Sequence, residues 1–172
     1  MGFTGNRKAH ALLHWLLNLL DPNELPPSID VDAIKQDLSS EMWEPASPNG
    51  LPDEEIALTY RKLCHNAKLL RTGESIVIAG YEIKVPISGG VKIKPAFTRG
   101  SVDRFEIILL CAILTAKDSL RRCRQCKEKK LPVLFVRNRR QEYCSKQCVQ
   151  VAGSKNFRSS HPKIRDKDRR QD

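Results

Sequence analysis

The residues of this chain most able to do chemistry are four cysteines, which stand in two close pairs. Cys123 and Cys126 are separated by two residues, seventeen residues follow, and Cys144 and Cys148 are separated by three. A two-residue gap allows a tight turn to aim both sulfurs at one point, and Cys148 stands one helical turn beyond Cys144. Thiolates that converge in this way bind a divalent metal, so the spacing predicts one structural zinc ion.

Other chemistry for these cysteines is less favoured. Disulfides, a redox-active Cys-x-x-Cys motif and unrelated buried thiols are the alternatives, and two close pairs at zinc spacing favour a metal over all three. Cys64 and Cys111 stand within apolar helical patterns and are expected to be small core residues. Four thiolates and one zinc ion carry a net charge of −2. Basic residues stand close enough in sequence to offset that charge: Arg121, Arg122, Arg124 and Lys127.

The segments around the cysteines predict how the two pairs are brought together. Residues 133–136 and 141–143 have the composition of two short strands, joined as a hairpin around Asn138, which returns the chain toward the first pair. The second pair opens a helix predicted over 145–158, and the dipole at the helix N-terminus favours negative thiolates. Knuckle, hairpin and helix in this order are typical of a treble-clef zinc finger, which we predict over residues 121–160.

Charge is unevenly distributed along the chain. Residues 1–120 hold 13 Lys and Arg against 15 Asp and Glu, a net charge of −2, whereas residues 121–172 hold 17 against 5, a net charge of +12. A concentrated cationic segment attracts polyanions and releases their counterions on binding. The alternative is a solvated, solubilising tail. Because the cations coincide with the cysteine module, we expect nucleic acid, most simply duplex DNA, as the partner.

A set of residues around the cysteine pairs also follows the pattern of a known family: Arg121-Arg122-Cys123 and Cys126, Leu134-Phe135, Arg139-Arg140, Tyr143-Cys144-Ser145, and Cys148. Over residues 120–158 the chain resembles the bacterial CGNR-type zinc finger, which follows an N-terminal domain of the ABATE type. The resemblance implies a transcriptional regulator that contacts DNA through the finger. The family's Gly-Asn-Arg after the last cysteine is replaced here by Val149-Gln150-Val151.

Candidate nucleic-acid contacts lie on the predicted hairpin and on the helix that follows it. Cations there are expected to contact phosphates, which position a protein on the duplex, and amides are expected to reach base edges, which specify sequence. The base-edge candidates are Gln147 and Gln150. The phosphate candidates are Arg137, Arg139, Arg140, Lys146, Lys155 and Arg158.

Two other function classes are open. Treble clefs also present surfaces to proteins, so a protein-interaction adaptor is the main alternative, and the fold alone decides nothing. A metal-dependent enzyme is less favoured, because catalytic zinc keeps an open coordination position and four cysteine ligands would fill it. We therefore predict a binding protein rather than an enzyme.

The first 120 residues predict a mostly helical domain with a small antiparallel β element, and hence an α+β fold class for the chain. Residues 75–97 alternate apolar and polar side chains around three glycines and predict two or three short strands. Apolar periodicity and Pro or acidic starts predict helices over 7–20, 32–42, 52–71 and 102–121.

Three regions follow from these patterns: an N-terminal domain over 1–120, the zinc finger over 121–160, and a basic tail over 161–172 that we expect to be disordered. The N-terminal domain shows no phosphate-binding glycine loop and no nucleophile motif, and homodimerisation is one role open to it. No stretch reaches the roughly 20 apolar residues that a membrane span needs, so we expect a cytoplasmic protein without a membrane partner.

Overall fold

The computed structural model describes residues 6–26, 29–40, 43, 46, 48–86, 90–97, 102–123, 125–126, 133–137 and 141–160. The elements in these ranges are α1 (Asn6–Leu17), the short 3-10 helix η1 (Pro22–Glu24), α2 (Val31–Leu38), α3 (Asp53–Thr72), β1 (Ile76–Ile78), β2 (Tyr81–Lys84), β3 (Lys92–Pro95), α4 (Arg104–Ala116), β4 (Leu120–Arg122), β5 (Leu134–Val136) and α5 (Lys146–Ser160). Helices with small antiparallel sheets confirm the α+β class. We call α1 to α4 the body and β4 to α5 the finger module.

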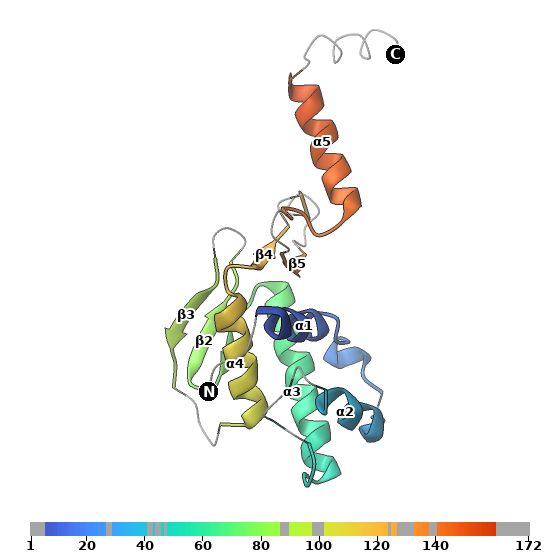
Figure 1. The fold of residues 1–172 in the computed structure, drawn as a ribbon, viewed down its shortest axis with the longest axis vertical. Coiled ribbons are helices and arrows are strands. Elements are labelled where there is room, and N and C mark those ends of the chain that lie inside the picture. Colours follow the sequence, from blue (N-terminus) through green and yellow to red (C-terminus); the bar gives the residue numbers. More distant parts are fainter. Residues whose placement is uncertain are drawn as a thin grey trace.

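The body is built around α1, which packs against both α3 and α4 (Figure 1). Its Leu12 and Leu16 are fully buried, as are Leu109 and Ile113 of α4. Burial of each such side chain stabilises the fold by roughly 1.5–3 kcal/mol before entropy is counted. The predicted helices at 7–20 and 32–42 are both present but shorter, ending at Leu17 and Leu38.

Three aromatic side chains form a cluster in the body's core. The ring of Trp43 is completely buried. It meets the ring of Trp15 at a centroid distance of 5.4 Å and that of Phe105 at 5.3 Å, both edge to face. This geometry places the positive ring edge against the negative ring face, which favours aromatic pairs beyond their burial. Both tryptophans of the chain therefore lie in the body.

The longest helix, α3, has ends that the sequence specifies clearly. Three acidic residues occupy its first turn, where the helix dipole favours them. Its last turn is closed by Gly73 in the left-handed conformation, with φ +86°. The Gly73 N–H donates to the Leu70 carbonyl and the Glu74 N–H to the Leu69 carbonyl, the paired bonds of a Schellman motif. The predicted helix over 52–71 is confirmed.

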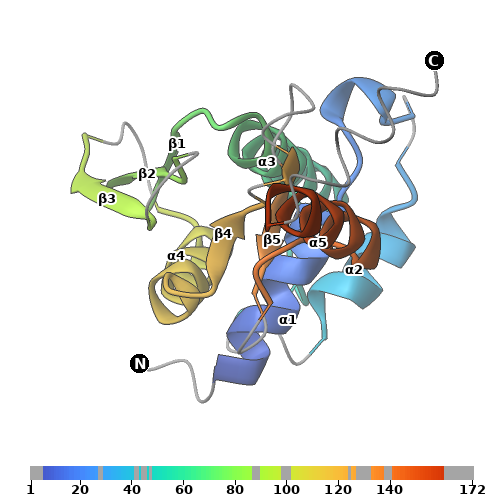
Figure 2. The ribbon, with the colours of Figure 1, turned by 90° about the horizontal axis from the view of Figure 1, so that it is seen from above.

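The three-stranded sheet is antiparallel in the order β1-β2-β3 and flanks α4 (Figures 1 and 2). Ala79 and Gly80 join β1 to β2, and both have positive φ, as a two-residue hairpin of the favoured hand requires. Ile76 pairs with Ile83, and both are buried, whereas Val77, which follows Ile76 and pairs with Glu82, is half-exposed on the other face. The strands predicted within 75–97 are confirmed.

The last body helix and the predicted hairpin of the finger are arranged differently from the sequence-based expectation. The helix predicted over 102–121 ends at Ala116, and Leu120–Arg122 forms the strand β4. The partner of β5 is β4 rather than residues 141–143, which form no strand. The chain leaves the helical pattern at Lys117 to Ser119, and the Arg137 N–H donates to the Ser119 carbonyl to close the new ladder.

The β4–β5 ladder separates two cores. Leu120 pairs with Val136, and Leu134 lies on the same face of β5. All three side chains belong to the apolar core of the body. Phe135 points to the opposite face and packs with the cysteine cluster. The predicted domain boundary between residues 120 and 121 thus falls inside β4, a strand whose body-facing side chains complete the main core.

Within the parts of the chain that the structure describes, no helix is both long enough and apolar enough to span a bilayer.

Two valines of the same segment test whether the ladder belongs to the body's core. Val136 is 1% exposed and Val133 is 48% exposed. We expect Val136→Ala to lower the free energy of unfolding by about 2–3 kcal/mol, because it removes buried methyl groups and leaves a cavity. Val133→Ala should change it by less than about 0.5 kcal/mol. Urea unfolding followed by tryptophan fluorescence reports the body, and equal effects of the two substitutions would contradict the shared core.

Candidate metal centre

Each cysteine of the cluster is placed by a different local feature. Cys123 directly follows β4, and its N–H donates to the Val133 carbonyl at 2.9 Å, which extends the ladder by one bond. Cys126 lies in a short helical turn. Cys144 lies in the bend before α5, and Cys148 in the first turn of that helix.

Ser145 fixes the start of α5. Its side-chain oxygen accepts a hydrogen bond from the Cys148 N–H at 3.2 Å, and its carbonyl accepts from the Val149 N–H. This is the arrangement of a helix N-cap, which supplies a partner for an otherwise unpaired amide. The cap therefore sets the direction in which α5 leaves the cluster and holds Cys148 toward the other sulfurs.

The four sulfurs converge as the sequence predicted. All four lie within 4.8 Å of one another. The Sγ of Cys126 is 3.6 Å from that of Cys144 and 3.7 Å from that of Cys148, and the Cys144 and Cys148 sulfurs are 3.7 Å apart. A tetrahedral ion with metal–sulfur bonds of about 2.3 Å requires sulfurs about 3.8 Å apart, whereas a disulfide requires about 2.05 Å. The separations fit a shared metal ion and exclude a bond between these three sulfurs.

The thiols are polarised by one another. Burial, followed by hydrogen bonding with the neighbouring sulfurs, raises the pKa of Cys144, and burial raises the pKa of Cys126. Burial also acts to raise the pKa of Cys123, but hydrogen bonds with Cys144 and Cys126 outweigh it and lower the pKa to about 7. One sulfur thus becomes a thiolate first, with protonated neighbours around it. A bound metal ion replaces those protons, so binding releases them to solvent.

The apolar surroundings of the cluster are small among the residues that the structure describes. Phe135 from the ladder is buried against it, and Tyr143 packs there while half-buried. A core of this size is too small to hold a chain segment in place by apolar burial alone. A metal ion shared by the four sulfurs would add the order that these described apolar contacts do not supply.

Of the four basic residues expected to offset the cluster's charge, Arg122 points away from the sulfurs. Arg122 is 6% exposed, and its side chain hydrogen-bonds to carbonyls of the body rather than facing the sulfurs. Arg121 lies on the other face of β4 and donates to the carbonyls of Lys117 and Leu120. Arg124 and Lys127 lie outside the described residues. Strand alternation at Leu120–Arg122 was the sequence signal that could have separated the two arginines.

The residues predicted to contact nucleic acid fall into two groups. Arg139, Arg140 and the side chain of Arg158 lie outside the described part of the structure, and Arg137 is half-buried at the end of β5. The remaining candidates are all exposed on α5: Lys146, Gln147, Gln150 and Lys155.

The outer face of α5 is defined by its helical spacing. At 100° per residue, Lys146, Gln150, Gly153 and Phe157 share a stripe on the side opposite Cys148 and the buried Ala152. Phe157 is 54% exposed, and a Cβ added at Gly153 would meet no atom within 4 Å. Figure 1 shows why this stripe is accessible, since α5 projects away from the body. Phe157 was not among the predicted contacts, although its helical spacing from Gln150 can be seen in the sequence.

Comparisons of the chain with protein-family models, curated proteins and solved structures find no match, so function has to be argued from the site itself.

The cluster predicts a simple stoichiometry. Purified protein is expected to carry about one tightly held metal ion per chain, and Cys126→Ser or Cys144→Ser should lose it, because each removes one of four ligands. Cys111→Ser is the matched control, since Cys111 is a half-buried thiol outside the cluster. Elemental analysis of the four proteins decides. Full metal retention in both cluster variants would show that the sulfurs are not the ligands.

Proposed function

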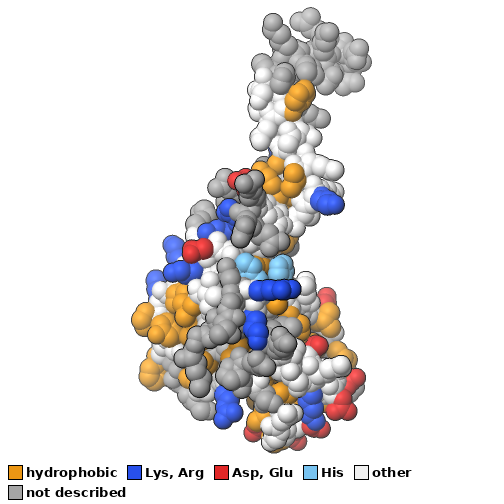
Figure 3. Space-filling view, in the orientation of Figure 1, with side chains coloured by type: hydrophobic (Ala, Val, Ile, Leu, Met, Phe, Trp, Pro, Cys, Tyr) orange, Lys and Arg blue, Asp and Glu red, His pale blue; other side chains and the backbone are white. Residues whose placement is uncertain are grey.

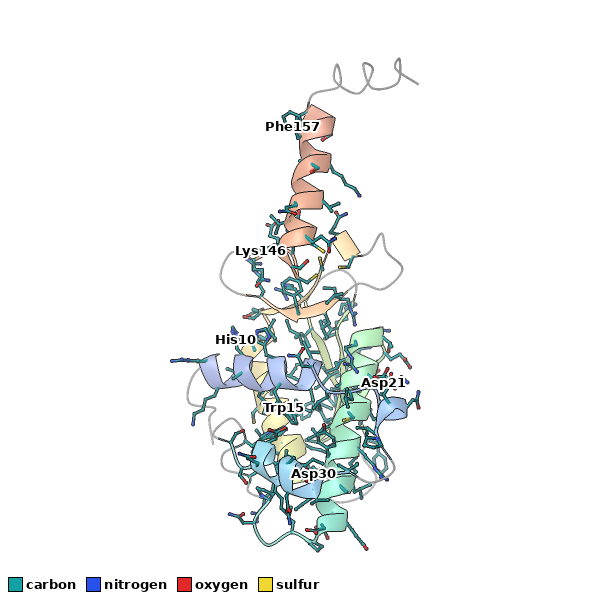
Figure 4. All side chains as sticks on the ribbon, turned by 90° about the vertical axis from the view of Figure 1, so that its right-hand side faces the viewer. His10, Trp15, Asp21, Asp30, Lys146 and Phe157 are labelled. Atoms are coloured by element: carbon teal, nitrogen blue, oxygen red, sulfur yellow. The ribbon has the colours of Figure 1, made fainter. Side chains whose placement is uncertain are left out.

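We propose that the chain is a zinc-stabilised nucleic-acid-binding protein, a DNA-binding transcriptional regulator that uses α5 as its principal contact. One observation carries the proposal. The four-sulfur cluster lies at the start of a 15-residue helix that projects from the body (Figure 4) and has the exposed Lys146 and Gln150 opposite its buried residues. A helix of that length extends about 22 Å, and a major groove about 12 Å wide admits it.

Zinc is the metal that the ligand set favours. Thiolates are soft ligands, four of them at tetrahedral separation suit zinc, and a complete ligand set leaves no position for substrate or water. We therefore propose a structural rather than a catalytic ion. The order of a turn with the first pair, the strand β5 and a helix with the second pair supports a treble-clef-like finger and the resemblance to the CGNR type.

Charge complementarity favours a polyanion as the partner of α5. The segment 143–165 contains no Asp or Glu, and it holds five cations, of which Lys146, Lys155 and Arg158 stand within the helix. Phosphates near the start of α5 would also benefit from its dipole. In this proposal Lys146 and Lys155 contact phosphates and Gln150, on the outer stripe, reaches base edges.

The basic surface continues onto the body. Helix α1 has no acidic residue in its first turn, where the dipole would favour one, and carries Arg7 and Lys8 there instead. His14 is exposed on the same helix, and His10 lies on the edge of α1 nearest the finger module (Figure 4). Figure 3 shows Lys, Arg and His side chains gathered where the finger module meets the body. We include this junction in the proposed interface.

A protein-interaction adaptor is the second candidate, and a specific observation favours it. Val149 is 52% exposed and Phe157 is 54% exposed on the same projecting helix. Apolar side chains at the centre of a patch are typical of protein interfaces. The two candidates differ in their response to salt, because phosphate contacts release counterions and apolar contacts do not.

Salt dependence therefore tests the proposal. We expect affinity of the zinc-loaded protein for duplex DNA to fall with salt at a logarithmic slope of about −0.9 per phosphate contacted. Replacing Lys146 and Lys155 together by Gln should make that slope shallower by about 1.8, if each contacts one phosphate. The control pair Lys62→Gln and Lys84→Gln removes equal charge from exposed positions on the body and should leave it unchanged. Fluorescence anisotropy across a salt series measures all three slopes.

Gln150→Ala should alter preference among duplexes selected from a random pool while leaving the slope intact, because base-edge contacts specify and phosphate contacts position. Salt-insensitive binding, or no binding at low salt by the zinc-loaded protein, would instead support the adaptor.

A further inference from the structure

The side chain next to the first metal ligand is anchored in the body. Arg122 immediately precedes Cys123 and is 6% exposed. Its Nε donates to the Val85 carbonyl and its Nη1 to the Arg71 carbonyl, each at 2.9 Å, and its Nη2 donates to the Leu70 carbonyl. One guanidinium thus joins β4 to the end of α3 and to the residue that follows β2.

The end of α3 is built to receive this cation. The last carbonyls of a helix have no partner within it and carry the negative end of its dipole, so a guanidinium fork suits them in both geometry and charge. Gly73 keeps the approach open, since a Cβ there would lie 3.3 Å from Nη2 of Arg122. Burial lowers the pKa of Arg122. The group nevertheless stays charged, and withdrawing its hydrogen-bond partners would leave a buried cation uncompensated.

We propose that Arg122 is a positioning residue for the metal centre, through which metal binding and folding of the body are thermodynamically linked. The inference rests on the proposed metal site. Arg122 pairs with Leu134 in the ladder, and Leu134 and Leu120 are buried in the body's core. Cys123 is therefore held where the ladder ends, before any metal arrives. In return, a bound ion holds the ladder on the body, so unfolding of the body requires release of the ion.

The chain offers a probe that reports the body alone. Its only two tryptophans are Trp15 and Trp43, both in the aromatic cluster with Phe105. Tryptophan fluorescence therefore follows unfolding of the body, while a chromophoric chelator competing for zinc follows the metal site. If the finger module folded independently of the body, zinc binding would change the chelator signal and leave unfolding followed by tryptophan fluorescence unchanged.

The first measurement is thermal unfolding of the full chain, followed by tryptophan fluorescence, at increasing free zinc. At a hundredfold excess of free zinc over the dissociation constant, linkage predicts a rise in the midpoint on the order of 5–10 °C for a chain of this size. The metal-free Cys126→Ser variant should show no such rise.

The second measurement is zinc affinity by chelator competition in Arg122→Met, which keeps the aliphatic stem and removes the guanidinium. We expect a loss of about 10–100-fold, the range typical of residues that support metal ligands, together with a smaller zinc-induced rise in the tryptophan midpoint. Lys62→Met is the control, because it removes one cation of the body from an exposed position on α3. It should retain wild-type affinity. Arg122→Lys keeps the charge but loses the guanidinium fork, so its zinc affinity should fall between that of Arg122→Met and that of the control. It replaces Arg122→Met in this comparison if Arg122→Met does not fold.

The outcomes separate the two proposals. Zinc binding by the wild type with an unmoved tryptophan midpoint, or equal zinc affinity in the Arg122 and Lys62 variants, would overturn the linkage and leave the metal site standing. Failure of the wild type to bind zinc at all would overturn the metal site and the linkage with it. A midpoint that rises with zinc in the wild type and less in the Arg122 variants supports both.

Discussion

The two-stranded β4–β5 ladder is the constraint on which the rest of the molecule depends. A ladder of three residue pairs is too short to be stable alone. It persists here because its two faces belong to different cores: Leu134 and Val136 complete the body, and Phe135 covers the cysteine cluster. Strand alternation makes this division automatic, since neighbouring residues point to opposite faces. A one-residue slip would place Phe135 in the body and a core aliphatic against the sulfurs.

The same alternation gives the adjacent arginines different roles. Arg121 lies half-buried on the face of Phe135, and Arg122 is buried on the face of the body. In a solvent-exposed loop, two arginines beside a thiolate cluster would both act as counter-charges. On this strand Arg122 instead adds donors at the end of α3, to the Arg71 carbonyl and to the Leu70 carbonyl, which also accepts from the Gly73 N–H. A residue that belongs by sequence to the finger thus caps a helix of the body.

The sequence allowed prediction of features set by nearby residues. Cys123 and Cys126 are separated by two residues and were expected to converge, and the apolar period that stops near Arg71 predicted where α3 ends. The pairing of Leu120 with Val136 depends on residues sixteen positions away, and the contact of Arg122 with Leu70 spans fifty-two. No local propensity encodes such partners. Leu120 continues the apolar period of α4, so it was predicted to be helical. In the structure α4 ends at Ala116, and Leu120 begins β4.

The position of the cysteine cluster also explains how a body with net negative charge can present a basic helix. A helix docked along the body would place its cations against that surface and lose outer-face accessibility. Instead, the buried residues of α5 among those described, Cys148 and Ala152, lie in its first turns, and the helix projects away from the body (Figure 1). A metal ion bound by the four cysteines would allow this with few residues, because it would replace the apolar contacts that otherwise have to hold the helix. The outer stripe from Lys146 to Phe157 is left accessible as a consequence.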